Sequence, residues 1–255
     1  GVGKTFWSDE LPFRVNEAES RATMAPGMLG QDAPPGADSI FRCQFHQSMS
    51  YEDFVQGYRP TQDGGFELRD GIFIKAVKHA HETRQFTVLV IDEINRGNIS
   101  KIFGELLSLV EADKRDPKWS VMLPYSGEEL WIPERFYILG MMNTADRSIS
   151  MVDYALRRRF GFIDMVPGFD RPQFEILLRR RGVSAKMLAS IRLSGGEVNQ
   201  LIAASPQHGS GFQIGHSYFI PNRVLEGHED ERDWYYNVIK YEVAPLLREY
   251  WFDDL

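Results

Sequence analysis

The chain begins with Gly1-Val2-Gly3-Lys4-Thr5, which matches the final part of the phosphate-binding pattern G-x-x-x-x-G-K-[S/T]. Backbone N–H groups in such a loop can point at phosphate oxygens, because glycine carries no Cβ that would block their approach. Lys4 would reach the β- and γ-phosphates of a nucleotide, and the Thr5 hydroxyl would ligate Mg²⁺. So short a match is also compatible with a glycine turn followed by an exposed Lys-Thr pair. A second sequence element is needed to distinguish a phosphate-binding loop from such a turn.

That second element is the apolar run from Phe86 to Ile91, which is followed by Asp92 and Glu93. A short run of mostly β-branched residues predicts a buried parallel strand, and α/β sheets bind ligands at the carboxyl ends of their strands. Asp92 would then hold Mg²⁺, and Glu93 would orient and deprotonate an attacking water. The alternative is a core strand that ends in a solvated acidic turn.

The order of the predicted elements indicates an α/β protein with two domains. Strands are expected at 39–46, 86–91, 137–142 and 162–166, helices at 72–82, 98–111 and 153–160, and hairpins at 59–71 and 119–136. After residue 166 the pattern predicts only helices, at 171–181, 185–191, 197–204 and 233–251. We therefore expect a parallel-sheet nucleotide-binding domain over residues 1–166 and an α-helical domain over 167–255.

The first domain is expected to be truncated at its N-terminal end. A phosphate-binding loop follows a β-strand that feeds it, and the chain contains neither that strand nor the first glycine of the pattern. We expect both to lie upstream of Gly1.

Composition limits the kinds of partner and the cellular compartment that we expect for this chain. The net charge of −7 and the pI of about 5.5 give no overall basic surface for nucleic acid. The single cysteine, Cys43, excludes an internal disulfide framework, is expected in the core, and fits a reducing cytoplasm. No apolar stretch approaches the ~18 residues that a membrane span requires, and the start has no signal-peptide pattern, so we expect a cytoplasmic protein with no membrane partner.

Polar residues after the 137–142 strand add to the predicted site. Asn143 could hydrogen-bond a hydrolytic water near the γ-phosphate, or it could form an Asx turn that ends the strand. Further on, Arg157, Arg158 and Arg159 would project in three directions from a helix. One of them could reach the nucleotide of a neighbouring subunit as an arginine finger, or all three could form a solvated basic helix end.

These stretches together resemble the McrB family, the AAA+ motor subunits of modification-dependent restriction systems within the dynein-related and MoxR-like group. The similarity rests on Gly1–Phe6 (GVGKTF), Phe45–Pro60, Ile91–Arg96 (IDEINR), Met142–Ser148 (MNTADRS), Val152–Phe160 (VDYALRRRF) and, in the second domain, Ile214–Phe219 (IGHSYF). The match spans most of the chain, and the Asn-Thr-Ala-Asp-Arg run is its most specific part.

The resemblance implies a P-loop NTPase (AAA+) with a three-layer α/β/α parallel-sheet domain and a small helical lid. It implies Mg²⁺-dependent hydrolysis of GTP, hexameric rings, and stimulation by an McrC-type endonuclease subunit, with DNA reached through the complex or a separate N-terminal domain. The residues that it implicates in nucleotide binding are Gly1, Val2, Gly3, Lys4, Thr5 and Phe6, those in catalysis are Glu93, Asn143, Asp146, Arg147, Arg158 and Arg159, and those at the metal are Thr5 and Asp92.

The chain departs from the family pattern in three places: the missing first strand, a longer loop at 24–38, and no DNA-reading N-terminal domain. Two other interpretations stay open: an ATP-dependent remodelling enzyme of the MoxR type, and a scaffold that binds nucleotide without hydrolysing it. No residue by itself selects GTP over ATP. His216 could contact the base or a neighbouring subunit, or it could be a packed lid histidine, and Glu105 and Glu111 are expected to be solvated.

Overall fold

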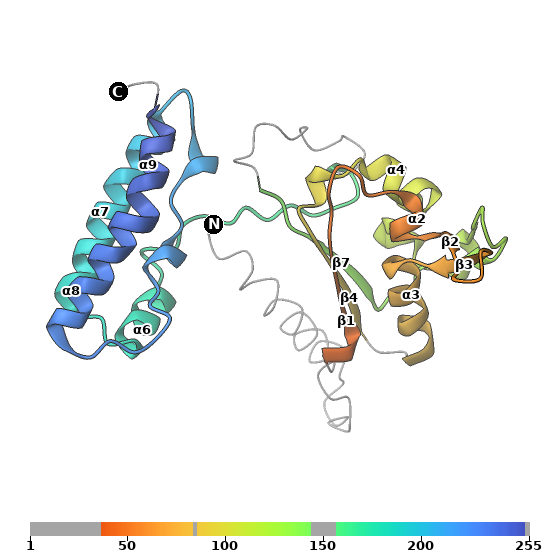
Figure 1. The fold of residues 1–255 in the computed structure, drawn as a ribbon, viewed down its shortest axis with the longest axis horizontal. Coiled ribbons are helices and arrows are strands. Elements are labelled where there is room, and N and C mark those ends of the chain that lie inside the picture. The colour runs from red at the N-terminus through yellow and green to blue at the C-terminus, as the bar shows by residue number, and fades with distance from the viewer. Residues whose placement is uncertain (1–36, 84–85, 144–156, 253–255) are drawn as a thin grey trace. The chain divides into compact units, whose positions relative to one another are not determined.

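The computed structural model describes residues 37–83, 86–143 and 157–252. The predicted phosphate-binding loop at 1–6, Asp146, Arg147 and residues 153–156 of the helix predicted at 153–160 lie outside the described residues. In the described part of that predicted helix, residues 158–160 form a turn and a bend, so the prediction is wrong there. The chain forms two compact units, which divide between Phe162 and Ile163, and each has its own hydrophobic core (Figure 1). The boundary that the sequence places after residue 166 stays a prediction.

The first unit is built on a parallel sheet of three described strands, in the order β1-β4-β7. The strands are β1 (Ile40–Gln44), β4 (Thr87–Asp92) and β7 (Phe136–Gly140). In the register, Gln44 pairs with Asp92 and Ile91 pairs with Gly140. The central strand β4 is buried along its length except at Asp92. The parallel α/β class predicted from the sequence is confirmed, and the carboxyl ends of all three strands lie at one edge of the sheet.

Helices α2 (Tyr51–Phe54), α3 (Ile72–Thr83) and α4 (Ile99–Phe103) lie on one side of this sheet (Figure 1). Their core contains a cluster of aromatic rings, in which the Phe54 ring centroid lies 4.9 Å from that of Phe103 and 5.3 Å from that of Phe73. Edge-to-face and tilted contacts of this kind add to the free energy of burial. The cluster therefore holds the three helices together, and the Phe73 ring, 5.7 Å from that of Phe136, joins them to β7.

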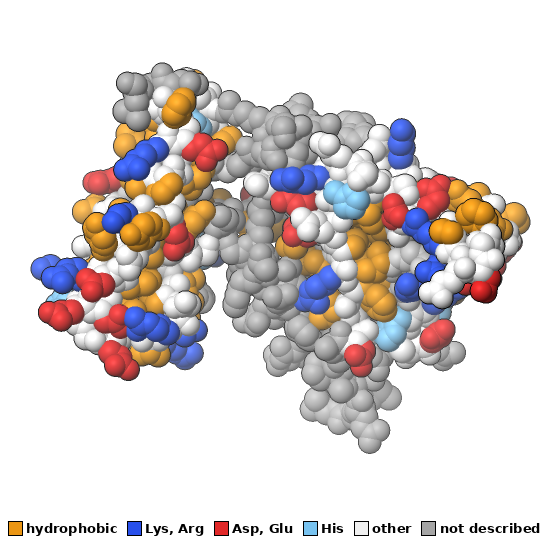
Figure 2. Space-filling view, viewed as in Figure 1, with side chains coloured by type: hydrophobic (Ala, Val, Ile, Leu, Met, Phe, Trp, Pro, Cys, Tyr) orange, Lys and Arg blue, Asp and Glu red, His pale blue; other side chains and the backbone are white. Residues whose placement is uncertain are grey.

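Two hairpins project from this unit, as the sequence predicted. They are β2 (Gln56–Pro60) with β3 (Phe66–Asp70), and β5 (Val121–Met122) with β6 (Glu129–Leu130), both antiparallel. The hairpins are joined, because the backbone N–H of Ser126 donates to Gln56 Oε1 at 3.1 Å. Hydrophobic side chains gather at this end of the unit (Figure 2), and Tyr58, Phe66 and Met122 are all more than half exposed.

The structure corrects two elements of the first unit. The predicted helix at 98–111 is α-helical only to Phe103 and continues as a 3-10 helix, because Gly104 has φ +54°, which breaks the α-helical path. The predicted strand at 162–166 is wrong. This segment is irregular, Ile163 and Val166 are exposed, and among the described residues no strand pairs with it. A strand needs a neighbour for its backbone hydrogen bonds.

The second unit is helical around its own hydrophobic core, as predicted. Its helices are α6 (Pro172–Arg180), α7 (Ala185–Ala204), α8 (Gly227–Asn237) and α9 (Ala244–Tyr250), and a π-helical segment (Val238–Val243) joins the last two. The two helices predicted at 185–191 and 197–204 are one helix, α7. The glycine pair between them does not break it: Gly195 is buried because the Phe169 ring packs where a Cβ would be, at 2.8 Å.

Short 3-10 segments connect the larger elements: η1 (Ala37–Ser39), η2 (Ile94–Arg96), η3 (Gly104–Val110), η4 (Ala112–Lys114), η5 (Pro117–Trp119), η6 (Ser210–Phe212) and η7 (His216–Phe219). None of the helices in the described ranges has both the length and the apolar character that crossing a membrane requires.

Candidate functional site

Asp92 is the last residue of β4, and its carboxylate lies at the open end of the strand. The backbone carbonyl of Asp92 accepts from the Phe45 N–H at 2.9 Å, which fixes this end of the strand to the segment after β1. Its side-chain Oδ1 accepts from the backbone N–H of Glu93 at 2.9 Å. One carboxylate oxygen is thus held in place, and the group lies at the edge of the sheet where the sequence predicted a ligand.

Glu93 begins a tight turn with an uncommon backbone conformation. Its φ of 51° and ψ of 41° lie in the left-handed region, and it is the only described residue other than glycine with a positive φ. Such a conformation costs an L-residue of order 1–3 kcal/mol and persists only where its surroundings fix it. Here the Ile94 N–H donates to the Met141 carbonyl at 3.0 Å, and the Arg96 N–H donates to the Glu93 carbonyl at 2.8 Å.

The Glu93 side chain is held as well. Its Oε2 lies 3.1 Å from Arg96 Nε, and both side chains are partly exposed, at 20% for Glu93 and 43% for Arg96. Backbone and carboxylate are therefore both restrained before any ligand is present. Such restraint is what a group that must orient a water requires.

Asn95 joins this turn to the end of β7 and was not among the candidate residues taken from the sequence. Its Nδ2 donates to the Asn143 carbonyl at 3.4 Å. Its Oδ1 is buried and, in the described part of the chain, has no hydrogen-bond partner. A buried amide oxygen without a partner is uncommon. The position of Asn95 in the sequence, two residues after Glu93, is the feature that could have identified it as a site residue.

The described residues of the arginine run differ in exposure. Arg157 and Arg158 are exposed, whereas the Arg159 side chain is only 14% exposed and its Nε lies 3.1 Å from Glu111 Oε1. The hydrogen bond from Lys114, together with the nearby charges of Arg159 and Arg158, lowers the pKa of Glu111 below its ordinary value. Glu111 was expected to be a solvated charge and is instead partly buried in an ion pair with Arg159, a contact between charges that is not a hydrogen bond.

Glu105 is also more than a solvated charge, because its Oε1 accepts from the Tyr51 hydroxyl at 2.7 Å. Burial and this hydrogen bond raise the pKa of Tyr51. The contact joins α2 to η3. Its role is structural, and it takes no part in the candidate site.

The donor set fits Mg²⁺ in the way that nucleotide-dependent enzymes hold it. Among the described residues there is no group of three or more His, Cys, Asp or Glu side chains that could bind a metal ion. Mg²⁺ is commonly held by one or two carboxylates together with substrate phosphates and water, without a cage of protein ligands. The carboxylate of Asp92 at the strand end suits that arrangement. Thr5, the other predicted ligand, lies outside the described residues.

In the helical unit, His216 is a packed residue. Its Nδ1 accepts from the Gly168 N–H at 2.9 Å, and its ring contacts Phe174 edge-on at a centroid distance of 5.5 Å. Burial, helped by the charge of Arg171, lowers the pKa of His216 and so favours the neutral ring. Within this unit the geometry favours the packing interpretation.

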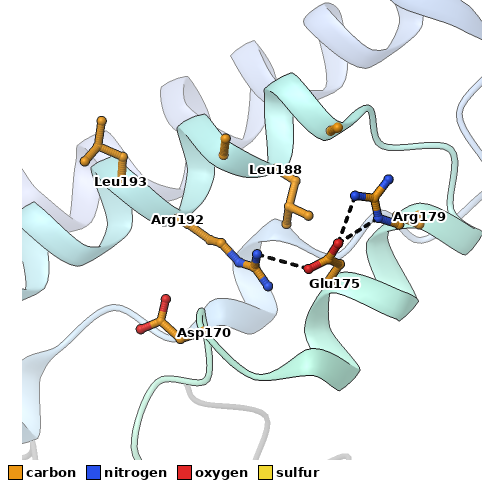
Figure 3. A pocket seen from close by; sticks show the side chains of 8 residues that line it. Asp170, Glu175, Arg179, Leu188, Arg192 and Leu193 are labelled. Atoms are coloured by element: carbon orange, nitrogen blue, oxygen red, sulfur yellow. Dashed lines mark hydrogen bonds and ion pairs between the residues drawn. The ribbon is translucent and has the colours of Figure 1, made fainter.

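A surface hollow of about 450 Å³ lies between α6 and α7 of the same unit. Glu175 lies between two arginines there, with Oε2 3.1 Å from Arg192 Nη1 and Oε1 2.8 Å from Arg179 Nη2 (Figure 3). Arg192 Nε also donates to the Phe169 carbonyl at 2.9 Å. These contacts join α6 to α7, and the hollow contains none of the predicted site residues.

Comparisons with known proteins bear on both units. The AAA domain family (dynein-related subfamily) matches residues 1–160, and the McrB α-helical lid domain matches residues 193–255. The "Type IV methyl-directed restriction enzyme EcoKMcrB subunit" of Escherichia coli is 44% identical over 259 residues, which cover 100% of this chain and 52% of that protein. The "Type II restriction enzyme BsuMI component YdiS" of Bacillus subtilis is 27% identical over 186 residues, 63% of this chain and 50% of that protein.

A solved structure of an ATPase from Cytophaga hutchinsonii has 18% identity and covers 63% of this chain and 47% of that chain, with a TM-score of 0.34. That score is too low to support an argument. The chain spans about half the length of the two curated relatives. The 44% identity over the whole of this chain to part of the Escherichia coli protein and the match of both units to their families agree with the carboxylates at the end of β4: the chain belongs to the dynein-related AAA family of P-loop NTPases and is of the McrB type, with an α/β domain followed by a helical lid.

Proposed function

We propose that this chain is the nucleotide-hydrolysing part of a ring-forming AAA+ motor that prefers GTP and serves a restriction complex. The observation that carries the proposal is the 44% identity over the whole chain to a subunit of a methyl-directed restriction enzyme. The pair Asp92 and Glu93 at the end of β4 supports it. A partner endonuclease of the McrC type and movement along DNA are parts of the same proposal.

Each predicted residue has a role in this proposal. Mg²⁺, when bound through Asp92 and Thr5, would neutralise charge on the β- and γ-phosphates. Glu93 would take the proton of the attacking water, and Asn143 would help to orient that water. The segment Gly1–Phe6 would cradle the phosphates, with Lys4 at the γ-phosphate.

Four further residues complete the proposed site. Asp146 and Arg147 would belong to the catalytic loop after β7. An exposed arginine, Arg158, would reach the nucleotide of the next subunit in a hexameric ring, and Arg159 would support it from its ion pair with Glu111.

The test is phosphate release from GTP and from ATP by the intact protein with Mg²⁺, measured with and without its endonuclease partner. We expect turnover of GTP in preference to ATP, and loss of turnover in Glu93→Gln. The matched control is Glu67→Gln, which removes an exposed carboxylate paired with Arg69 on β3 and should leave turnover unchanged. A preference for ATP would favour a remodelling enzyme, and nucleotide binding without turnover would favour a scaffold.

A further inference from the structure

The turn after β4 fixes Glu93 in two independent ways. Its backbone is held in the left-handed region by the hydrogen bonds from Ile94 to the Met141 carbonyl and from Arg96 back to Glu93. Its carboxylate is held through Oε2 by Arg96 Nε at 3.1 Å. Because Arg96 lies three residues after Glu93 in the same short turn, one local structure controls both the main chain and the side chain.

The two carboxylate oxygens of Glu93 are thereby made different. Oε2 is occupied by the guanidinium, while in the described part of the chain no hydrogen bond is made to Oε1. A general base needs one oxygen pointed at the water and a restraint that stops the group from rotating. Without the restraint, a glutamate with three side-chain torsions would lose conformational freedom each time it met its water.

We propose that Arg96 is a positioning residue for the hydrolytic reaction, which holds Oε2 so that Oε1 of Glu93 faces the attacking water. This inference rests on the proposed function and adds a residue to it. Arg96 acts through Glu93 and need not touch the nucleotide. Guanidinium suits the task, because its Nε–H donor lies in a rigid plane that fixes the direction of the hydrogen bond to Oε2, whereas a lysine ammonium acts as a flexible point charge.

The experiment compares steady-state GTP hydrolysis by the intact wild-type protein, Arg96→Ala and Arg96→Lys. We expect Arg96→Ala to lower kcat by about 10- to 100-fold, the size of effect that follows from losing a group that orients a catalytic side chain. KM should stay within about threefold of wild type, because ground-state binding of the nucleotide is untouched. Arg96→Lys should recover part of kcat, since one charged hydrogen bond to Oε2 can still form.

Two controls separate positioning from a structural role. Arg69→Ala removes an exposed arginine that is ion-paired with Glu67 in the same unit, and should behave as wild type. Adding Arg96→Ala to Glu93→Gln should leave GTP binding as tight as in Glu93→Gln alone, because Arg96 acts through Glu93 and not on the nucleotide. Melting temperatures of all variants show whether each protein is folded.

The outcomes are distinct. An Arg96→Ala variant with unchanged or faster kcat, or with raised KM alone, overturns the inference while leaving the proposed function in place, provided that wild type hydrolyses GTP and Glu93→Gln does not. Weaker GTP binding when Arg96→Ala is added to Glu93→Gln also overturns it. A wild-type protein that turns over neither nucleotide overturns the proposed function, and this inference with it.

Discussion

Asn199 offers a sharp test of how the lid holds the 214–219 segment, which carries the lid's share of the McrB resemblance. The side chain lies on α7 and is only 5% exposed. Its Nδ2 donates to the Ile214 carbonyl at 2.9 Å, and its Oδ1 accepts from the Ile214 N–H at 2.6 Å. Both polar groups of one buried backbone residue are therefore satisfied by one amide side chain, at the start of the segment.

Asn199→Ala removes both partners at once. Leaving a buried donor or acceptor unsatisfied costs about 1–3 kcal/mol, so two orphaned groups should cost about 2–6 kcal/mol. Entry of water into the space that the side chain leaves would bring the cost toward the lower end. Gln200→Ala is the matched control, because Gln200 is the exposed neighbour on the same helix; its effect should stay within about 0.5 kcal/mol.

The assay is urea unfolding of the intact protein, together with hydrogen exchange at the Ile214 amide. Since about 1.4 kcal/mol corresponds to a tenfold change in an equilibrium constant, a loss of about 2 kcal/mol should speed exchange at this amide about 30-fold. A loss below about 0.5 kcal/mol in Asn199→Ala, or equal losses in Asn199→Ala and Gln200→Ala, would refute the reasoning.

Three further predictions concern the α7 glycines, His216 and Cys43. Gly196→Ala should raise the free energy of unfolding by about 0.5–1 kcal/mol, because alanine favours the helix α7. In urea unfolding, Gly195→Ala should be about 1–3 kcal/mol less stable than Gly196→Ala, because a Cβ at residue 195 would meet the Phe169 ring at 2.8 Å. Equal stabilities of the two variants would contradict this. His216, whose pKa is lowered by burial, should make lid stability fall as the pH drops below about 6.5, since the unfolded state then binds the extra proton. Melting temperatures between about pH 7 and pH 5 test this, and a slope that is the same in His216→Gln would contradict it. Burial raises the pKa of Cys43 to about 12, so alkylation at about pH 8 should be far slower in the native protein than in urea, and equal rates would show that the thiol is accessible.

Local pattern predicted most of the first unit, because its strands and hairpins follow rules that act over a few residues. The apolar run before Asp92 is buried on both faces as β4, and the Ser126-Gly127 turn lies between β5 and β6 as expected. The failures involve contacts between residues that are far apart in the sequence. The sequence predicted two helices, at 185–191 and 197–204, with Gly195 between them. Only the ring of Phe169, from the segment before α6, explains why a glycine is required where α7 continues.

The candidate site shows the same division. The sequence pointed to Glu93 from its position after a buried strand, which is local information. It did not point to Asn95, whose importance comes from a contact with the Asn143 carbonyl after β7. Likewise, a run of like charges gave no means of ranking Arg158 against Arg159, because the difference lies in the ion pair to Glu111, which is distant in sequence.

That ion pair bears on how the arginine run would work in the proposed ring. A guanidinium that is 14% exposed and ion-paired with Glu111 would have to leave that pair to reach another subunit. Arg158 is exposed, and its neighbour on the chain is fixed, so the fixed residue would limit where the exposed one can point. An arginine that stabilises transition-state charge has to be delivered accurately. In the proposed mechanism the Arg159–Glu111 ion pair therefore positions this part of the chain, and the guanidinium of Arg158 stabilises the transition-state charge at the neighbouring subunit's nucleotide.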